Sequence, residues 1–572
     1  MATLFPCHYA LKSNLMSPRV ILCALLLAGS LFARQPVLGQ HAMVVAQEPL
    51  ATDVGIAVLK AGGNAVDAAV AVGFALAVTY PYAGNIGGGG FMLVRFADGK
   101  TTFIDFREKA PLSASRNMYL DANGKVTSDS LVGWRACGVP GSVRGFGLAH
   151  EKYGRKPWAE LIDPAVQLAT GGFPLTFQFT QSLIAGTPNN KLLSKFPESK
   201  RIFLTPHYGD SLSQPELAAT LKRIRDNGPA DFYEGEIAHK LAAAMEANGG
   251  LITLEDLKQY QAVERAPLRG RYRDYEVITA PPPSSGGIGI LQMLGMLEGS
   301  GYEKGGAGSA ASIHYVAEAM RRFYADRSEY FGDPDFFKVP GTKLLDPRYI
   351  ARRRASIDPR RATSSQQIRA GNLASYESTE TTHFNVVDNE GTAVAVTYTL
   401  NGGYGNGVTV PGLGFLLNNE MDDFAAKPGE ENMFHLIQGE ANAIQPGKRP
   451  LSSMTPTILT RDGKVFLVLG APGGSRIING VLQVILNVVD FHMNVQDAVD
   501  WPRFHHQWMP DEIFLERGIS PDTVAILRGM GHKIAPYENT APVIARVEAI
   551  VNENGWLQGA ADGRGNAKAE GY

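Results

Sequence analysis

Cysteine is scarce in this chain of 572 residues, which contains three. Cys7 and Cys23 fall within the first 39 residues, so Cys137 is the single thiol of the remainder. One cysteine cannot form an intramolecular disulfide, and we expect the fold to be stable without one. Asn-x-Ser/Thr glycosylation sites are absent as well, which for an exported chain favours a bacterial over a eukaryotic surface protein.

Excess charge of either sign is also missing. The chain has 54 Lys and Arg against 56 Asp and Glu, a formal net charge of −2. Such a balance creates no strong field for nucleic acid or anionic lipid, so we expect a small partner that is recognised locally. No repeat with a period of 20–50 residues is visible, and residues 145–330 show no acids or histidines grouped at metal-ligand spacing.

The longest hydrophobic run lies near the N-terminus. Residues 1–39 contain three basic residues and no acid, and 20–33 form an almost purely apolar run of 14 residues. This length is typical of a signal-peptide core and short for a membrane span of about 17–25 residues. We expect a secretory leader cut between Ser30 and Gln40, and therefore a periplasmic or secreted protein; an uncleaved anchor is the alternative.

A predicted hairpin at 383–399 is the centre of the functional interpretation. Residues 383–388 and 392–399 are rich in Val, Thr and aromatics, and Asp388-Asn389-Glu390-Gly391 between them is typical of a turn. Thr381 stands just before the first strand. If the chain were cut at that point, Thr381 would gain a terminal amine able to act as the base for its own hydroxyl. The alternative is an ordinary surface loop that enters a hairpin.

The flanking sequence predicts a mixed α and β scaffold. Helices are expected at 53–61, 64–80, 288–297 and 311–330, and a strand at 275–280. Strand pairs are expected at 91–96 with 101–106 and at 455–460 with 465–469, and residues 416–423 suggest a short strand that ends in acids. Ala471 to Arg476 should turn into a helix that runs to about Val489, with glycine amides suited to binding an anion.

Two segments are predicted to be exposed and loosely held. Residues 341–380 combine runs of arginine with a polar stretch, and residues 427–450 are rich in Gly, Asn and Pro. We interpret the first as a tether that can be severed and the second as a flexible flap.

Six motifs in order resemble one family. They are Asp105-Phe106-Arg107-Glu108, Thr381-Thr382-His383, Thr397 to Asn401, Asn418 to Phe424, Arg449 to Met454 and Pro472 to Arg476. Together they resemble γ-glutamyltransferase, also called glutathione hydrolase, from about His41 to the C-terminus. The resemblance implies an α+β, four-layer αββα fold of the N-terminal-nucleophile hydrolase type, made as a bacterial-type proenzyme that cuts itself.

The resemblance also implies a division of the chain. Residues 1–39 would be the leader, 40–380 a large subunit that includes the tether at about 341–380, and 381–572 a small subunit that begins at Thr381. The cut would fall between Glu380 and Thr381, and the two subunits would stay together as a heterodimer. The implied substrates are glutathione and related γ-glutamyl compounds, and the γ-glutamyl group would pass to water, amino acids or dipeptides.

The roles of single residues follow from the same resemblance. Thr381 would be the nucleophile, Thr399 would orient it, and the amides of Gly473 and Gly474 would hold the oxyanion. A clamp would bind the substrate's α-amino-acid end: Arg107, Ser452 and Ser453 on its carboxylate; Asn401, Glu420 and Asp423 on its ammonium. No metal, organic cofactor, nucleic-acid partner or stable membrane anchor is implied.

Three further expectations concern single side chains. Phe434 occupies the aromatic position of the family's lid loop without a hydroxyl, which would weaken lid closure and favour transfer to water. Cys137 is expected to be a buried structural thiol. His505 and His506 are expected to be structural, because neighbours on a strand point to opposite faces.

Two rival functions were weighed against this interpretation. One is a family acylase that accepts glutaryl or β-lactam side chains, which should lack the ammonium clamp. The other is an inactive secreted binding protein on the same fold, which should lack part of the set formed by Thr381, Thr399, Gly473 and Gly474.

Overall fold

A computed structural model describes residues 34–369, 381–428, 439–536 and 543–572. The leader expected at 1–39 therefore lies almost wholly outside the described residues. Within those residues no helix is both long and apolar enough to cross a membrane. Residues Pro36 to Tyr572 form one compact unit.

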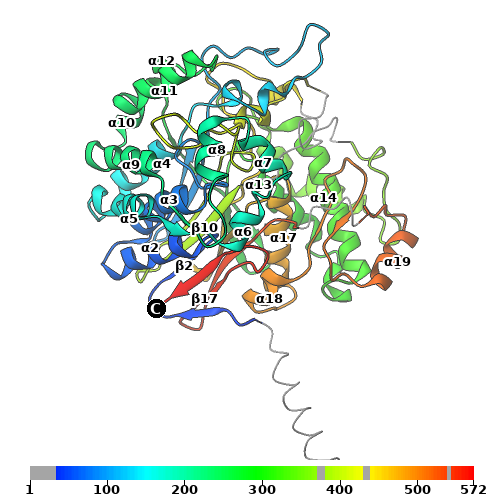
Figure 1. The fold of residues 1–572 in the computed structure, drawn as a ribbon. Coiled ribbons are helices and arrows are strands. Elements are labelled where there is room, and N and C mark those ends of the chain that lie inside the picture. Colours follow the sequence, from blue (N-terminus) through cyan, green and yellow to red (C-terminus); the bar gives the residue numbers. More distant parts are fainter. Residues whose placement is uncertain (1–33, 370–380, 429–438, 537–542) are drawn as a thin grey trace, which may run out of the picture. The chain divides into compact units, whose positions relative to one another are not determined.

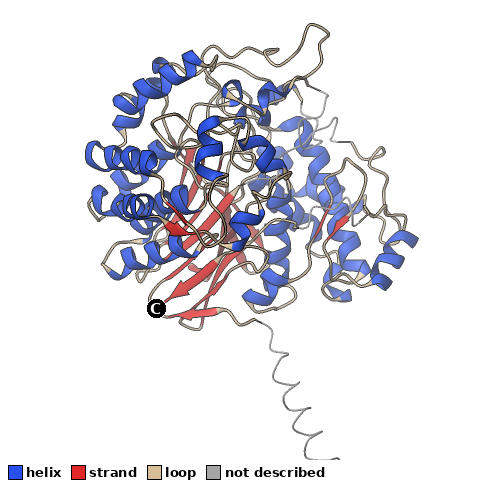
Figure 2. Ribbon diagram, in the orientation of Figure 1, coloured by secondary structure: helices blue, strands red, loops and turns tan. Residues whose placement is uncertain are grey.

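Two antiparallel sheets of seven strands form the centre of the described unit (Figure 2). The first sheet has, in order, β18 (Lys568–Gly571), β2 (Met43–Ala46), β10 (Thr382–Val387), β11 (Ala393–Thr399), β3 (Gly89–Arg95), β4 (Thr101–Phe106) and β7 (Val263–Arg265). The second has β1 (Val37–Gly39), β17 (Trp556–Ala560), β16 (Glu548–Glu553), β13 (Lys464–Gly470), β12 (Thr457–Arg461), β9 (Tyr275–Thr279) and β8 (Leu268–Tyr272). Two small pairs join β5 (Phe173–Pro174) to β6 (Ser211–Leu212) and β14 (Phe504–His505) to β15 (Phe514–Leu515).

The two sheets stack face to face, and helices cover both outer faces (Figure 1). The first sheet is covered by α2 (Pro49–Lys60), α3 (Ala65–Thr79) and α4 (Ser142–Tyr153), and behind these lie α5 (Trp158–Gly171) and α9 (Pro215–Asn227). The second is covered by α13 (Gly286–Leu297), α17 (Arg476–Val489) and α18 (Val495–Asp500), with α14 (Ala310–Tyr330) against α13. The expected four-layer αββα, α+β architecture is confirmed.

The remaining helices are short or peripheral. They are α6 (Phe177–Gln181), α7 (Pro188–Leu193), α8 (Pro197–Phe203), α10 (Ala230–Tyr233), α11 (Glu236–Ala247), α12 (Leu254–Gln259), α15 (Gly341–Leu344), α16 (Pro347–Ala355) and α19 (Pro521–Gly529). Among the described residues, 3-10 turns lie at Ser128–Ser130, Trp134–Ala136, Tyr302–Gly305, Glu420–Asp423 and Glu440–Asn442.

Side-chain alternation along the strands separates two hydrophobic cores. In β2, Met43 and Val45 join the core between the sheets, whereas Val44 and Ala46 join the core under α2 and α3. A strand sends successive side chains to opposite faces, and burial on both faces explains why these strands are apolar throughout. Helix α3 is buried along its whole length, and an Asn64 capping box fixes its start.

Most expected elements agree with the structure within a few residues. The hairpin at 383–399 is β10 and β11, which pair from Thr382 opposite Tyr398 to Val387 opposite Ala393. The turn before α17 and its end at Val489 are as expected.

Three expectations about local structure were wrong in whole or in part. Residues 416–423 form no strand: they make a bridge at Leu416 and a 3-10 turn at Glu420–Asp423. Residues 341–369 are mostly exposed or half-buried, as expected, but they are not without structure, because they contain α15 and α16 and bury Ser365 and Ile368; the rest of the expected tether, 370–380, lies outside the described residues. The flap expected at 427–450 is well packed after the undescribed residues 429–438, since Asn442, Lys448 and Arg449 are all buried.

Candidate active site

Thr381 lies immediately before β10 and is 5% exposed. Along β10, Phe384 and Val386 face the helices, whereas Val387 faces the second sheet. Because side chains alternate, Thr381 shares the inner face with His383 and Val387. The nucleophile candidate therefore points into the space between the two sheets.

Thr399 lies opposite Thr381 on the neighbouring strand. Thr382 pairs with Tyr398, and extending this pairing by one residue brings the two threonines together on the same face. The Thr399 hydroxyl accepts a hydrogen bond of 2.8 Å from the amide of Asn401. Orientation of the Thr381 hydroxyl by Thr399 stays a prediction for the cut enzyme.

The turn at Gly473 and Gly474 comes from the facing sheet. Strand β13 ends at Gly470, and a Cβ on that glycine would lie 2.3 Å from the ring of His383, so the start of β10 lies directly over this strand end. Gly473 and Gly474 have φ of 138° and 58°, a backbone region that favours glycine. Neither amide donates a backbone hydrogen bond in the part of the chain that the structure describes. Two unused amides before a helix are suited to an oxyanion.

Arg107 forms the centre of a buried charge cluster with three carboxylates. Its Nη1 lies 2.6 Å from Glu420 Oε2 and 3.4 Å from Glu108 Oε2, and its Nη2 contacts Asp423 Oδ2. Burial raises the pKa of Glu108 to about 8, and burial raises the pKa of Glu420 well above its usual range; Arg107 opposes both shifts. Glu420 and Asp423 hold Arg107 in place. The same carboxylates can instead bind an incoming ammonium group.

Three carboxylate oxygens of this cluster have neither a hydrogen-bond partner nor an ion pair among the described residues. They are Glu108 Oε1, Glu420 Oε1 and Asp423 Oδ1, and all three side chains are buried. A buried acceptor without a donor costs free energy, which an ammonium group bound between these oxygens would recover.

Hydrogen bonds between two loops hold Asn401 beside this cluster. Asn401 has a left-handed φ of 72°, and its side-chain amide donates to the carbonyl of Asn419 at 3.0 Å. The side chain of Asn418 donates to Gly87 and Gly138 and accepts from the amide of Glu420. These bonds explain why a 3-10 turn, and not a strand, presents Glu420 and Asp423.

Ser452 and Ser453 lie in an extended segment that is bonded to the start of α13. The amide and the hydroxyl of Ser285 both donate to the carbonyl of Ser452, at 2.8 and 2.9 Å. The Ser453 hydroxyl accepts from Arg327 Nη2 at 3.4 Å. Arg107 Nη2 donates to the neighbouring Leu451 carbonyl at 3.2 Å, so the two serines lie beside the Arg107 cluster.

Sequence reasoning missed Arg327, Asn418 and Glu108 as site residues. Arg327 lies on α14, is 1% exposed, and donates to the Ser285 hydroxyl at 2.8 Å. Its charge also lowers the pKa of Asp423, against the larger effect of burial, which raises it. No local pattern distinguishes this arginine from a solvated one, because its partners lie 42 and 126 residues away. Glu108 and Asn418 lie within two of the six motifs, and their place in these motifs was the signal that could have identified them as site residues.

One group of potential metal ligands lies away from this site. His314, Glu318 and His532 bring one ligand atom each within 4.8 Å of one another. His314 Nε2 donates to the Asp358 carbonyl, so its Nδ1 accepts from His532 Nε2 at 2.8 Å. Glu318 is paired with Arg321 and Arg322. Hydrogen bonds use these atoms and two guanidiniums lie beside them, so the arrangement disfavours a cation.

The remaining single-residue expectations have mixed outcomes. Cys137 is fully buried, and burial raises the pKa of its thiol, as expected for a structural cysteine. His505 and His506 are buried and bonded to protein groups, among them Asn479 and Trp508. Glu380 and Phe434 lie outside the described residues.

Comparison with known families identifies the fold's relatives. The family described as gamma-glutamyltranspeptidase matches residues 51–572. The chain belongs to the gamma-glutamyltranspeptidase family. Its fold is that of the N-terminal-nucleophile hydrolases, as expected from the motifs.

Curated relatives place the chain within this family. It is 50% identical over 534 residues to the glutathione hydrolase proenzyme of Escherichia coli K12, which covers 92% of this chain and 91% of that protein. It is 40% identical to the glutathione hydrolase proenzyme of Bacillus subtilis 168, and 38% identical to the acylase ACY 1 proenzyme of Pseudomonas sp. SE83, each over more than 90% of both chains. The acylase is the more distant of these relatives.

Solved structures of two enzymes share the fold. The cephalosporin acylase of Bacillus halodurans matches with a TM-score of 0.81 at 26% identity and covers 95% of this chain and 97% of its own. The gamma-glutamyltranspeptidase of Helicobacter pylori matches with a TM-score of 0.55 at 41% identity, over 59% of this chain and 97% of the solved chain.

Proposed function

We propose that this protein is a γ-glutamyltransferase and glutathione hydrolase whose nucleophile, Thr381, is released by cleavage of the Glu380–Thr381 bond. The observation that carries the proposal is the way the two sheets meet at the start of β10. Thr381 and Thr399 lie on the inner face of the first sheet, and the amides of Gly473 and Gly474, which donate no backbone hydrogen bond among the described residues, follow the strand of the second sheet that packs against His383. The relatives' names, glutathione hydrolase proenzyme, support the same activity.

The reaction uses the new chain terminus as its base. The α-amine of Thr381, with an ordinary pKa of about 7.7–8.0, takes the proton of the Thr381 hydroxyl as the oxygen attacks the γ-carbonyl. The amide C–N bond breaks, the amine product leaves with a proton, and a γ-glutamyl ester remains on Thr381. Water or an acceptor amine then attacks the ester and restores the hydroxyl.

The charge cluster accounts for selection of the glutamate end. The substrate carries an ammonium and a carboxylate on its α-carbon, and the cluster offers Glu420 and Asp423 to the first and Arg107 to the second. An α-linked peptide would leave these buried groups unpaired, which costs a few kcal/mol. Ser452 and Ser453 add hydroxyls on the carboxylate side.

The acylase alternative is less consistent with the charge cluster around Arg107. It requires that the ammonium clamp be lost, whereas Asn401, Glu420 and Asp423 are all buried beside Arg107. The inactive binding protein requires a damaged catalytic set, whereas Thr381, Thr399 and both glycines are in place.

Export and subunit assembly complete the proposal. Residues 1–39 would act as a cleaved leader that delivers the protein to the periplasm or the medium, as their basic start and apolar run indicate. The chain would then split at Thr381 into large and small subunits that remain a heterodimer. Proenzyme names among the relatives support this division.

A pair of anilide substrates tests the activity and the clamp together. The wild-type protein should release p-nitroaniline from L-γ-glutamyl-p-nitroanilide at least about 10-fold faster than from glutaryl-p-nitroanilide, which lacks the ammonium group. Asp423→Asn should remove most of this preference, because a neutral amide attracts the ammonium less. Faster release from the glutaryl compound by the wild type would favour the acylase, and release from neither would contradict both enzymes.

A further inference from the structure

A buried polar network lies behind the turn at Gly473 and Gly474, and the proposed reaction does not use it directly. Ser475 follows the two glycines and is 2% exposed. Its carbonyl accepts a hydrogen bond from the Tyr324 hydroxyl, and its own hydroxyl donates to Gln507 Oε1 at 2.8 Å. Two side chains from distant parts of the chain thus hold one residue by its carbonyl and its hydroxyl.

Ser475 departs from the usual behaviour of a serine that precedes a helix. It stands directly before α17, where a serine hydroxyl normally accepts a hydrogen bond from an amide of the first turn. Here the backbone of Ser475 is already helical, with φ of −53° and ψ of −30°, and its side chain makes no cap hydrogen bond. The carbonyls of Gly473 and Gly474 instead accept from the first two amides of α17. The hydroxyl is therefore used for a tertiary contact, to Gln507, and not for a local one.

Gln507 is held in turn by a buried histidine. Because the Asn479 side-chain nitrogen donates to Nδ1 of His505 at 2.7 Å, the Nε2 of this ring carries the proton and donates to the same Gln507 oxygen at 2.8 Å. The Tyr324 ring lies edge-on to the His505 ring, with centroids 6.0 Å apart. All four side chains are buried, and hydrogen bonds between buried groups are stronger than in water, so the network restricts the position of Ser475.

Helix α14 connects the glycine turn to the substrate clamp. Tyr324 and Arg327 are three residues apart on this helix, so their side chains lie on one face. Tyr324 donates to Ser475 beside the turn, whereas Arg327 donates to the hydroxyl of Ser453. The clamp would hold the α-amino-acid end of the substrate and the glycine amides its γ-carbonyl, so the spacing between these two parts has to match a glutamate side chain. Neighbouring side chains of one helix fix that spacing.

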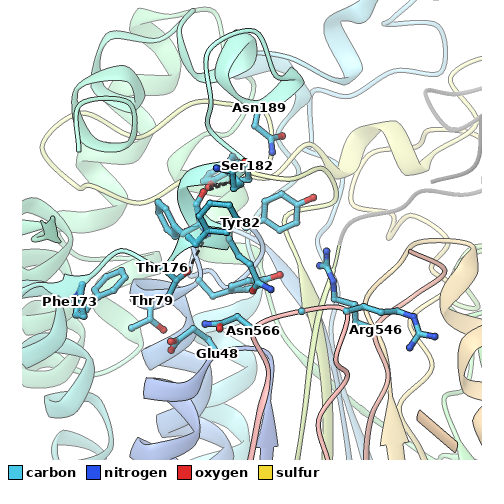
Figure 3. A pocket seen from close by; sticks show the side chains of 18 residues that line it. Glu48, Thr79, Tyr82, Phe173, Thr176, Ser182, Asn189, Arg546 and Asn566 are labelled. Atoms are coloured by element: carbon cyan, nitrogen blue, oxygen red, sulfur yellow. Dashed lines mark hydrogen bonds between the residues drawn. The ribbon is translucent and has the colours of Figure 1, made fainter. Parts of the chain in front are cut away.

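A backbone contact holds the turn on the side of the segment before β16. The amide of Arg546 donates to the Pro472 carbonyl at 3.2 Å, and a Cβ on Gly473 would lie 2.8 Å from Ala545 Cα. Figure 3 shows the Arg546 side chain at the wall of a cavity of about 340 Å³, which neither glycine of the turn lines. The backbone contact fixes the residue before the two glycines, and the network at Ser475 fixes the residue after them.

We infer that Tyr324 and Gln507 are positioning residues that keep the amides of Gly473 and Gly474 directed at the oxyanion. The inference rests on the proposed function and adds to it two residues outside the catalytic set. When negative charge develops on the γ-carbonyl oxygen, donors that are already fixed stabilise it without reorienting, and a donor that loses its orientation loses part of this effect. Both side chains act through Ser475 and not on the substrate itself.

Tyr324→Phe removes the hydroxyl, keeps the ring and so tests the hold on the Ser475 carbonyl. The substrate is L-γ-glutamyl-p-nitroanilide, and rates are expressed per cut chain. Complete loss of one oxyanion donor costs roughly 10²–10³ in kcat and misorientation costs less, so kcat should fall about 10-fold while KM stays within about twofold. An unchanged kcat, or a rise in KM that accounts for the whole loss of kcat/KM, would overturn the inference.

The matched control is Tyr302→Phe, at the other end of α17. Tyr302 is 1% exposed, and its hydroxyl donates at 2.6 Å to Asp490, the residue that follows this helix. The length of α17 places this bond roughly 20 Å from Ser475. The control loses a buried tyrosine hydrogen bond at the same helix and should keep kcat within about twofold of the wild type. Equal losses of kcat in the two variants would show that weaker packing of α17, and not the turn, explains the effect.

A double-mutant cycle tests the hold on the Ser475 hydroxyl. Ser475→Ala and Gln507→Met remove the same hydrogen bond from its two ends, so each should lower kcat severalfold, and the double variant should be no slower than the slower single variant. Unchanged kcat in both single variants, or losses that multiply in the double variant, would contradict the role of Gln507. A wild-type protein that never releases p-nitroaniline would instead contradict the proposed function, so the two failures are distinct.

Discussion

Single residues at the Gly473–Gly474 turn give a direct test of transition-state stabilisation. A Cβ on Gly473 would lie 2.8 Å from Ala545 Cα, so Gly473→Ala must displace the amides that face the oxyanion. These amides act on the transition state, and we expect kcat to fall about 10²-fold while KM changes much less.

The control for this variant is Gly463→Ala. Gly463 has a φ of 73° in the turn between β12 and β13, and nothing lies within 4 Å of its Cβ position. This substitution introduces backbone strain far from the site and should leave kcat within about twofold of the wild type. Comparable losses of kcat in both variants would show that strain alone, and not oxyanion binding, explains the effect.

A buried histidine leads to a second prediction about a single residue, which concerns how the stability of the fold depends on pH. Burial, with help from Arg476, lowers the pKa of His505 to about 3, so the folded protein holds this ring neutral. The unfolded chain has a pKa near 6.5 and binds a proton that the fold does not, so stability is present above pH 6.5 and is lost as pH falls below it.

The comparison uses His505→Gln in the uncut Thr381→Ala background. From pH 5.5 to 4.5 the parent should lose about 1.4 kcal/mol more of its stability than the variant, because one more proton is bound on unfolding. Urea-unfolding midpoints followed by tryptophan fluorescence report the difference. Parallel pH profiles for the two proteins would contradict a neutral buried His505.

Sequence alone pointed to candidate site residues that stand in local motifs, and of the three neighbours that it missed, Arg327 is the one that depends on distant partners. Thr381, Arg107 and Gly473 lie at strand ends or tight turns, where residue type and position carry the information. Arg327 lies inside a helical run, and only the fold shows that Ser285 and Ser453 receive it. Burial of a charge is a tertiary property that helical spacing does not encode.

At the scale of elements, residues 356–369 form a strap fixed to two parts of the molecule. Arg322 donates to Ser356, and Glu318 accepts from Thr363 on the α14 side. Asp511 accepts from the amide and hydroxyl of Ser365, and Trp508 donates to the carbonyls of Ser365 and Ile368. The arginine-rich composition suggested exposure, but these contacts come from residues up to 150 positions away.

The strap predicts local protection against proteolysis. Asp511→Asn weakens the bonds to Ser365 and the ion pair to Arg321, so trypsin should cut after the exposed Arg369 about 10-fold faster. The cleavage rate is followed by mass spectrometry under native conditions. Asp129→Asn, at a half-exposed acid elsewhere, is the control and should leave the rate unchanged. No acceleration in Asp511→Asn would show that this carboxylate does not hold the strap.

The contrast between local and distant contacts also explains which elements the sequence predicted correctly. Strands β10 and β11 are runs rich in Val, Thr and aromatic residues, buried throughout and joined by an Asp-Asn-Glu-Gly turn, so their predicted bounds were close. Residues 416–423 have a similar apolar start, but the Asn418 side chain bonds two other segments, at Gly87 and Gly138, and the amide of Glu420 in its own segment, which ends the extended backbone. Side-chain hydrogen bonds of this kind depend on distant partners, which local secondary-structure propensity does not reveal.

At the scale of the whole described unit, both sheets interleave residues from the two sides of Thr381. In the first sheet β10 and β11 lie between β2 and β3, and in the second sheet β12 lies beside β9 while β17 lies beside β1. A cut at Thr381 therefore divides the chain but not the sheets, since strand pairing and two hydrophobic cores hold the pieces together.

This topology predicts an inseparable heterodimer. The cut protein should elute from a native sizing column as one species with the mass of both fragments, and it should separate only when denaturant unfolds it. Light scattering coupled to the column measures the mass, and a denaturing gel of the same peak shows the two chains. Release of the small fragment in native buffer would contradict the interleaved sheets.

The identity of the small fragment's first residue tests the central claim most directly. Mature wild-type protein should separate on a denaturing gel into chains of about 340 and 192 residues, and Edman sequencing of the smaller should read Thr-Thr-His-Phe from Thr381. Thr381→Ala should remain one chain, and Thr381→Ser, which keeps a hydroxyl, should still be cut. A fragment that starts elsewhere, or a Thr381→Ala protein that still splits, would contradict the assignment of Thr381 as the nucleophile.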